Sequence, residues 1–244
     1  MNDIYEKMIS RQVEIINKQE QDKIRNLPVC VVGCGGLGGT IIEQLVRTGF
    51  ENITIIDGDV FDLTNLNRQI RSNLESIGDS KSGVTKQAML KINPNLNIVA
   101  YDVIIDEDNL GDLIADSKIV IDAVDNVLTR VIISRECKKR NIVFVHCAVD
   151  ETMGQLSVFD GNGPSYEELF NLKSVNKELD SQVVEYLSNL SSRKPQVLGV
   201  LPSIFASLQV NETVKYILGK SELLSPRVLM WNIFDLESFR IIDF

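Results

Sequence analysis

The stretch Val29-Cys30-Val31-Val32-Gly33-Cys34-Gly35-Gly36-Leu37-Gly38 decides the fold of this chain. A short run of β-favouring residues stops at a glycine, and apolar residues with helical spacing follow in residues 40–46. A strand, a glycine turn and a helix in this order direct backbone N–H groups and the positive end of a helix dipole at a phosphate. The sequence therefore predicts a nucleotide-binding turn formed by Gly33, Gly35, Gly36 and Gly38. A glycine-rich turn without a ligand is the alternative.

Strands and helices alternate through the rest of the chain. Further buried strands are expected at residues 53–56, 97–101, 119–123 and 142–145, with helices at 82–92 and 127–140. Repeated strand-helix-strand units predict an α/β, Rossmann-like, mostly parallel sheet with helices on both faces. Alternating residues at 154–159, followed by a helix at 203–218 and strands at 228–234 and 239–243, predict an antiparallel C-terminal extension.

The chain divides into a short N-terminal segment and one main domain. Residues 1–27 are polar with spaced Ile and Val, which predicts helices packed outside a domain of residues 28–244. A chain of 244 residues with 44% hydrophobic residues can bury one substantial core. Residues 174–196 are polar and irregular, so we expect a mobile crossover loop there.

Composition narrows the class of partner and the compartment. The formal net charge of −9 repels nucleic acid, and no Lys/Arg run opposes it. The four cysteines, Cys30, Cys34, Cys137 and Cys147, form no C-x-x-C pair, so disulfides and a zinc knuckle are not expected. The N-terminus has no apolar signal core, and no run of about eighteen apolar residues occurs. We expect a cytoplasmic protein that does not enter a membrane.

Asp57 follows the second expected strand, about twenty residues after the glycines. An acidic side chain at this place can accept hydrogen bonds from a ribose diol, and it fits NAD as well as ATP. The alternative is a solvated acid or a cap in the turn Asp57-Gly58-Asp59, and the two interpretations are about equally supported.

Three charged residues at later βα loops favour ATP. Adenylation needs cations that neutralise a triphosphate and a carboxylate that holds magnesium, whereas hydride transfer needs neither. Arg68 and Lys81 are candidates for the cations, and Asp125 is the candidate for Mg²⁺. Taken singly, Arg68 and Lys81 could be surface cations, and Asp125-Asn126 could be a helix N-cap.

With these motifs in order, the sequence resembles the ThiF/MoeB/HesA family, the bacterial relatives of ubiquitin-activating enzymes. The resemblance runs from about Arg11 to Gly219. It rests on residues 33–38, 56–59, 65–69, 78–81, 92–94, 125–126 and 199–202. It implies that residues 28–244 are a single ATP-binding adenylation domain.

The resemblance also implies a role for each matching residue. Gly36 would line the phosphate turn, Asp57 would hold the ribose, and Lys81 would steady the α-phosphate. Asn65 and Arg68 would reach the phosphates, Asp125 would hold Mg²⁺ and Asn126 would lie against the nucleotide. Arg11 resembles the arginine finger that relatives supply from the other subunit, which implies a catalytic homodimer. A solvated helix residue is the plain alternative for Arg11.

The sequence departs from the family pattern at the metal and thiol positions. Ser165 and Glu168 stand where many members carry a C-x-x-C pair, and no second pair follows, so we expect no zinc site. Residues 186–201 contain no cysteine, which excludes covalent thiol transfer from that loop. A reactive Cys34 beside a helix N-terminus is a minority alternative. His146 and Trp231 are predicted to be core residues.

The resemblance implies an enzyme that joins a carboxylate to AMP and releases pyrophosphate. Its substrate would be the C-terminal glycine of a small ubiquitin-like sulfur carrier with a Gly-Gly end, used for thiamin or molybdopterin synthesis. A peptide or a modified tRNA nucleoside carboxylate is the alternative substrate. Two other classes stay open, namely an NAD-dependent oxidoreductase and a noncatalytic dimer partner that kept the fold.

Overall fold

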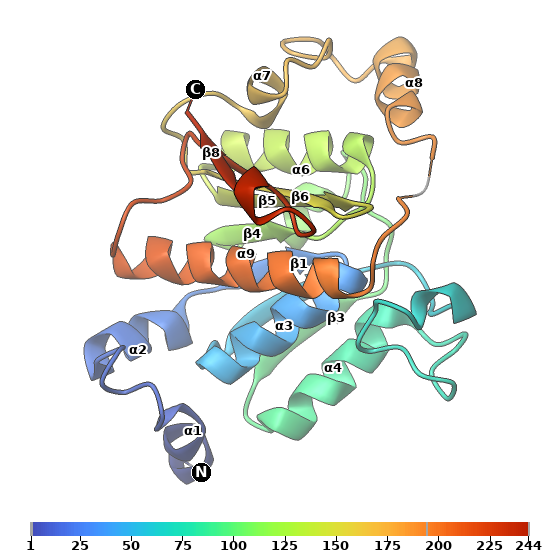
Figure 1. Ribbon diagram of the computed structural model, residues 1–244. Helices are drawn as coiled ribbons and strands as arrows, with labels where there is room; N and C mark the ends of the chain where they lie inside the picture. Colours follow the sequence, from blue (N-terminus) through green and yellow to red (C-terminus); the bar gives the residue numbers. More distant parts are fainter. Residues whose placement is uncertain (1, 194, 244) are drawn as a thin grey trace.

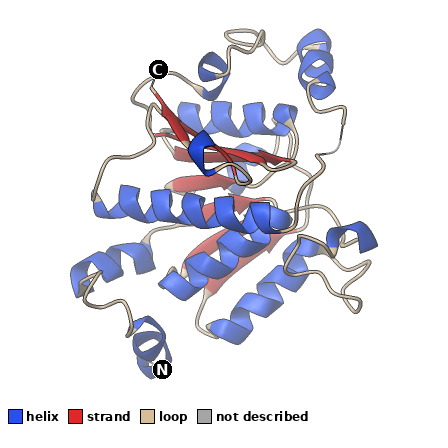
Figure 2. Ribbon diagram, viewed as in Figure 1, coloured by secondary structure: helices blue, strands red, loops and turns tan. Residues whose placement is uncertain are grey.

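The computed structural model describes residues 2–193 and 195–243, which form one sheet flanked by helices (Figures 1 and 2). Within these residues the sheet has eight strands in the order β3-β2-β1-β4-β5-β6-β7-β8. They are β1 (Val29–Val32), β2 (Asn52–Ile56), β3 (Asn97–Tyr101), β4 (Ile119–Asp122), β5 (Val143–Asp150), β6 (Met153–Phe159), β7 (Val228–Asn232) and β8 (Arg240–Ile242). The first five pair in parallel and the last three pair antiparallel, which confirms the predicted fold class.

The helices cover both faces of this sheet (Figure 1). The α-helices are α1 (Asn2–Ile9), α2 (Lys18–Asn26), α3 (Gly36–Thr48), α4 (Lys81–Ile92), α5 (Leu110–Leu113), α6 (Val127–Arg140), α7 (Tyr166–Leu169), α8 (Ser181–Asn189) and α9 (Val200–Leu218). Two 3-10 turns, η1 (Leu63–Asn65) and η2 (Leu236–Ser238), complete the set for the described residues. None of these helices has the length and apolar composition needed to cross a bilayer.

Strand β1 shows why the sheet is covered on both faces. All four of its side chains are buried, and they alternate between two apolar cores. Val29 and Val31 belong to the core that includes α3 and α9, whereas Cys30 and Val32 belong to the core that includes α6 and α8. A continuous apolar run is typical of a parallel strand buried on both faces.

Burial also explains how α3 is fixed to the sheet. Ile41, Ile42, Leu45 and Val46 are fully buried on this helix, and each such side chain stabilises the fold by about 1.5–3 kcal/mol. Phe205 of α9 lies in the same core. Helix α3, which begins at the glycine turn after β1, is therefore packed firmly against the sheet.

The expectation of an irregular crossover at residues 174–196 is wrong for α8. The Asp180 side chain accepts hydrogen bonds from the amides of Gln182 and Val183, which caps this helix. Val183 and Leu187 are buried one helical turn apart, and both pack in the core with α6. The sequence does contain the helical spacing of Val183 and Leu187, but these are two apolar residues in a mostly polar segment, so the spacing alone did not predict a helix.

The strand order places the candidate site. Strand β1 has β2 on one side and β4 on the other, so the connections from the carboxyl ends of β1 and β4 diverge there. Ligands of doubly wound sheets bind in the crevice outside the carboxyl ends of the strands at such a switch point. The glycine turn after β1 lies at this position.

Candidate active site

A cavity of about 1470 Å³ opens at the carboxyl ends of β1, β2 and β4. Pockets for small molecules usually measure about 300–1000 Å³, so this one has room for more than one ligand. It brings together most of the predicted site residues, namely Gly33, Gly35, Gly36, Asp57, Asn65, Arg68, Lys81, Asp125 and Asn126. Gly38 and Arg11 do not line it.

The glycine turn leaves backbone donors open to the cavity. Gly33 has a φ of +99°, and a Cβ there would lie 2.6 Å from the Ala123 carbonyl oxygen. Gly35 is the N-cap of α3, and it has no side chain that could accept hydrogen bonds from the amides of the first turn. Two of these amides belong to Gly36 and Leu37, which line the cavity. A Cβ on Gly38 would overlap the Gly33 carbonyl. Gly38 therefore permits the turn, while the other glycines present it to a ligand.

Asp57 follows β2 and is hydrogen-bonded to the glycine turn after β1. Its carboxylate accepts hydrogen bonds from the amide of Cys34 at 2.6 Å and from the amide of Asp59 at 2.8 Å. Burial raises the pKa of Asp57, while these two amide bonds oppose the rise. A carboxylate has about four lone-pair sites, so Asp57 can cap the turn and still accept from a ribose.

A long loop between β2 and α4 carries Asn65 and Arg68. Phe61 is buried and anchors the loop, and η1 is closed by a capping box in which Asn65 Oδ1 accepts from the Asp62 amide at 3.0 Å. Arg68 donates to the Thr64 carbonyl and to Asn67 Oδ1, both at 2.9 Å. These bonds hold the Arg68 guanidinium at the cavity wall. Loops of this length in compact domains usually serve function.

Lys81 begins α4 and is 7% exposed. Its Nζ atom forms an ion pair at 2.9 Å with Asp59, whose side chain is 70% exposed. Sequence reasoning did not identify Asp59 as this partner, although it stands two residues after Asp57. The buried cation therefore has a fixed place in the cavity, and its partner is accessible to solvent.

Asp125 and Asn126 lie in the turn between β4 and α6. Asn126 Oδ1 accepts from the Thr129 amide at 2.8 Å, so the predicted alternative of an N-cap holds for this residue. Asp125 is exposed, and no hydrogen bond or ion pair engages its carboxylate in the part of the chain that the structure describes. A free carboxylate at the wall of the cavity is suited to a hard divalent cation such as Mg²⁺.

Arg11 lies at the other end of α3 from the glycine turn. Its neighbour Gln12 donates to the Thr48 carbonyl at 2.9 Å, and Tyr5 donates to the Gly49 carbonyl at 2.9 Å. A helix as long as α3 spans about 20 Å, which separates Arg11 from the cavity of its own chain. Arg11 is exposed there.

A buried chain of charged and polar side chains supports the turn that carries Asp125. Asp122 is fully buried and accepts from Arg130 Nε at 2.6 Å, and its Oδ2 lies 2.7 Å from His146 Nδ1. Asp122 also accepts from the Val124 amide at 3.0 Å, and Arg130 donates to the Val124 carbonyl at 2.7 Å. A carboxylate at the end of an apolar strand requires such partners, but the sequence could not identify them.

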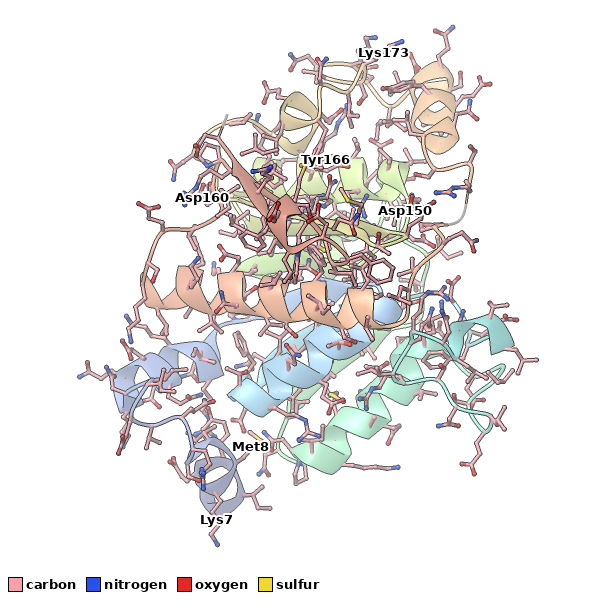
Figure 3. The ribbon with its side chains drawn as sticks, in the orientation of Figure 1. Lys7, Met8, Asp150, Asp160, Tyr166 and Lys173 are labelled. Carbon is pink, nitrogen blue, oxygen red and sulfur yellow. The ribbon has the colours of Figure 1, made fainter. Side chains whose placement is uncertain are left out.

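His146 lies inside β5 and is fully buried, as predicted for a core residue. Its ring meets Tyr166 of α7 edge-on at 5.0 Å; Tyr166 is labelled in Figure 3. Burial lowers the pKa of His146 to about 4, although the hydrogen bond to Asp122 opposes the shift. The imidazole is therefore neutral at physiological pH.

The lowered pKa of His146 predicts that the folded protein becomes less stable in acid. An unfolded histidine titrates near 6.5, so between about pH 6.5 and pH 4 the unfolded state binds a proton that the native state does not. The free energy of unfolding should fall by roughly 3 kcal/mol as the pH falls through this window. Urea unfolding of the wild type and His146→Gln checks it, because the variant lacks the titrating ring. A difference between the two proteins that does not change with pH would contradict the assignment.

The four cysteines are buried, and Trp231 is partly buried against the core. All four cysteines are free and buried, and burial raises the pKa of Cys34 well above its usual range, with the charge of Asp57 adding to the rise. Burial and the raised pKa both argue against the alternative of a reactive Cys34. Trp231 packs against Phe205 and Phe239, with ring centroids 6.5 and 5.8 Å away. Ser165 and Glu168 form the capping box of α7.

Comparisons with known sequences give the same family that the motifs suggested. The profile described as the ThiF family matches residues 9–243. A probable molybdopterin-synthase adenylyltransferase of Porphyra purpurea is 34% identical over 230 residues, covering 93% of this chain and 58% of that protein. A SAMP-activating enzyme E1 of Haloferax volcanii is 28% identical, covering 91% and 78%. The adenylyltransferase and sulfurtransferase MOCS3 of Aedes aegypti is 33% identical, covering 91% and 49%. The chain thus spans about half the length of most of these relatives.

Solved structures share the fold. E. coli MccB, crystallised with AMPCPP and MccA, superposes with a TM-score of 0.79 at 20% identity, over 97% of this chain and 71% of that one. PaaA superposes with a TM-score of 0.76 at 22% identity, over 97% and 81%.

Proposed function

This chain belongs to the ThiF family, and from that premise we propose that it is an ATP- and Mg²⁺-dependent adenylyltransferase that activates a carboxylate. One observation carries the proposal. Arg68, Lys81 and Asp125 line the same cavity as the glycine turn and Asp57. Two cations and a free carboxylate beside a phosphate-binding turn suit a nucleoside triphosphate, and hydride transfer has no use for them.

The reaction follows from these positions. A carboxylate oxygen of the substrate attacks the α-phosphorus of ATP, a phosphorus–oxygen bond forms, and the bond to pyrophosphate breaks. The first-turn amides of α3 bind phosphate oxygens at Gly36, and Asp57 accepts from the ribose. Lys81 and Arg68 neutralise charge that develops on the phosphates, with Asn65 beside them and Asn126 against the nucleotide. Asp125 would hold Mg²⁺, which when bound neutralises phosphate charge.

The printed names of the relatives support a particular substrate. They include a molybdopterin-synthase adenylyltransferase, a SAMP-activating E1 and an adenylyltransferase and sulfurtransferase. We therefore propose the C-terminal glycine of a small ubiquitin-like sulfur carrier as the acyl group, in molybdopterin or thiamin synthesis. A peptide or a modified tRNA nucleoside carboxylate is the alternative.

Nucleotide choice is the quickest test of this proposal. Titration calorimetry with ATP plus Mg²⁺ should show binding that Lys81→Ala weakens, and NAD should bind much more weakly. Binding of NAD in preference to ATP would support the oxidoreductase instead. Binding of neither nucleotide would support a noncatalytic partner of an active relative.

Arg11 makes a homodimer part of the proposal. Because Arg11 cannot reach the cavity of its own chain, it can act only on the cavity of a second copy. Arg11→Ala and Lys81→Ala should each be nearly inactive alone. After mixing and subunit exchange, half of the dimers pair the two variants, and one of their two sites is intact. Pyrophosphate exchange should then recover to about a quarter of the wild-type rate. If the mixture stays inactive although subunit exchange has been demonstrated, Arg11 does not act on the cavity of the other subunit.

A cytoplasmic location is consistent with the thiols. All four cysteines are free in the structure, including those packed in the two cores. Cysteines stay reduced in the cytosol, whereas secreted proteins commonly pair them. We propose the cytoplasm as the compartment.

A further inference from the structure

One part of the cavity differs in chemistry from the part lined by the glycine turn, Asp57 and Lys81. This part, which we name the acyl arm, lies where β5, β6 and β7 meet the cavity. It is lined by Ala148, Val149, Met153, Gly154, Gln155 and Met230. All six residues are uncharged. Of the charged residues next to them that line the cavity, Asp150 pairs with Arg193 at 2.7 Å, and Arg130 pairs with the buried Asp122 at 2.6 Å. The glycine turn, Asp57, Arg68, Lys81 and Asp125 are among the residues that line the cavity elsewhere. An uncharged acyl arm beside the charged part of the cavity suits a substrate whose uncharged segment leads to the reacting carboxylate.

Gln155 is the one polar side chain among these six, and a buried neighbour orients it. Its Nε2 atom lies 3.3 Å from His146 Nε2, and His146 Nδ1 lies 2.7 Å from Asp122 Oδ2. An ionised carboxylate can only accept, so His146 Nδ1 carries the proton. The low pKa of His146 keeps the ring neutral, and its Nε2 therefore accepts from the Gln155 amide.

This arrangement fixes what Gln155 can offer to a ligand. One of its N–H groups is used by His146, which leaves the carbonyl oxygen and the second N–H. A carbonyl and an N–H on one planar amide match the N–H and the carbonyl of a peptide group. Asp122 bonds both to the turn that carries Asp125 and to the ring of His146. One buried carboxylate therefore supports both the acyl arm and the turn of Asp125.

We infer that Gln155 is a specificity-determining residue that hydrogen-bonds a peptide group of the acyl substrate, and that His146 is its positioning residue. The inference rests on the proposed adenylation and narrows its substrate to a polypeptide C-terminus.

Two stable mimics of the acyl-adenylate isolate the peptide group. Glycylglycyl sulfamoyl-adenosine contains one peptide bond. Aminopentanoyl sulfamoyl-adenosine has the same chain length and the same terminal amine, but methylene groups replace that bond. We expect calorimetry to show that the wild type binds the glycylglycyl compound about tenfold tighter. Gln155→Leu should bind both compounds equally while its ATP affinity stays unchanged.

The outcomes separate this inference from the proposed function. If Gln155→Leu keeps the tenfold preference, or if the wild type has none, the inference is overturned while tight binding still supports adenylation. Absence of a preference in the wild type would favour a non-peptide acyl group such as the nucleoside. If the wild type binds neither mimic, the proposed function fails and the inference fails with it.

A matched pair of variants tests the role of His146. A glutamine amide can reach the place of Nε2, whereas an asparagine amide can reach only the place of Nδ1. His146→Gln should therefore keep most of the preference for the glycylglycyl compound, and His146→Asn should lose it. ATP binding checks that both variants are folded. If both then show the same preference for the glycylglycyl compound, His146 does not position Gln155.

Discussion

Replacing Lys81 with alanine is expected to lower the rate of adenylation by about a hundredfold to a thousandfold. Lys81 is a buried cation that lines the same cavity as Asp57, and its Nζ is already fixed by Asp59 at 2.9 Å. A preorganised charge aimed at the transferring phosphoryl group contributes about 3–4 kcal/mol to stabilisation of the transition state. ATP–pyrophosphate exchange measures the loss directly.

Lys86→Ala is the matched control for this prediction. It removes a lysine from the same helix, five residues further along and outside the cavity. The exchange rate of Lys86→Ala should stay within a factor of two of wild type, since surface substitutions of this kind change little. A Lys81→Ala enzyme that is as active as Lys86→Ala would remove Lys81 from the proposed mechanism.

The second large effect is expected at Asp125. Asp125→Asn should lower pyrophosphate exchange by about a hundredfold to a thousandfold at fixed Mg²⁺, because the carboxylate would be a ligand of the metal that shields the phosphates. Part of the loss should be recovered at high Mg²⁺ concentration. The free energy of unfolding should stay within about 0.5 kcal/mol of wild type, since no internal bond of the described chain uses Asp125.

Asp116→Asn serves as the control for Asp125. Asp116 is exposed and lies outside the cavity, so neither its rate nor its Mg²⁺ dependence should change. If Asp125→Asn shows wild-type dependence on Mg²⁺, the residue does not hold the metal, and its open position in the cavity needs another explanation.

Local signals in the sequence were sufficient for the parallel part of the fold. The run Val29–Val32 followed by glycines fixed strand, turn and helix, because a buried strand and a turn that excludes Cβ atoms leave few other conformations. The motif residues of the later loops then met in one cavity because parallel strands end at the same edge. Gly38, predicted as one of the glycines of the nucleotide-binding turn, does not line the cavity, and its missing Cβ leaves room for the Gly33 carbonyl.

Contacts between distant residues could not be predicted. Asp122, Arg130, His146 and Gln155 come from β4, α6, β5 and β6, and no spacing in the sequence pairs them. The pairing of Lys81 with Asp59 was missed for the same reason. Only the register between β5 and β6, in which Ala148 faces Gln155, brings the chain of bonds to the cavity.

The most direct test of the central claim is ATP–pyrophosphate exchange by the purified protein with Mg²⁺. The panel would contain carrier proteins that end in Gly-Gly, short peptides and tRNA that bears a carboxylate. The account predicts exchange with a polypeptide C-terminus, abolished in Lys81→Ala and Asp125→Ala. Silence across the panel, together with no measurable ATP binding, would contradict it and would favour a noncatalytic partner that has kept the fold.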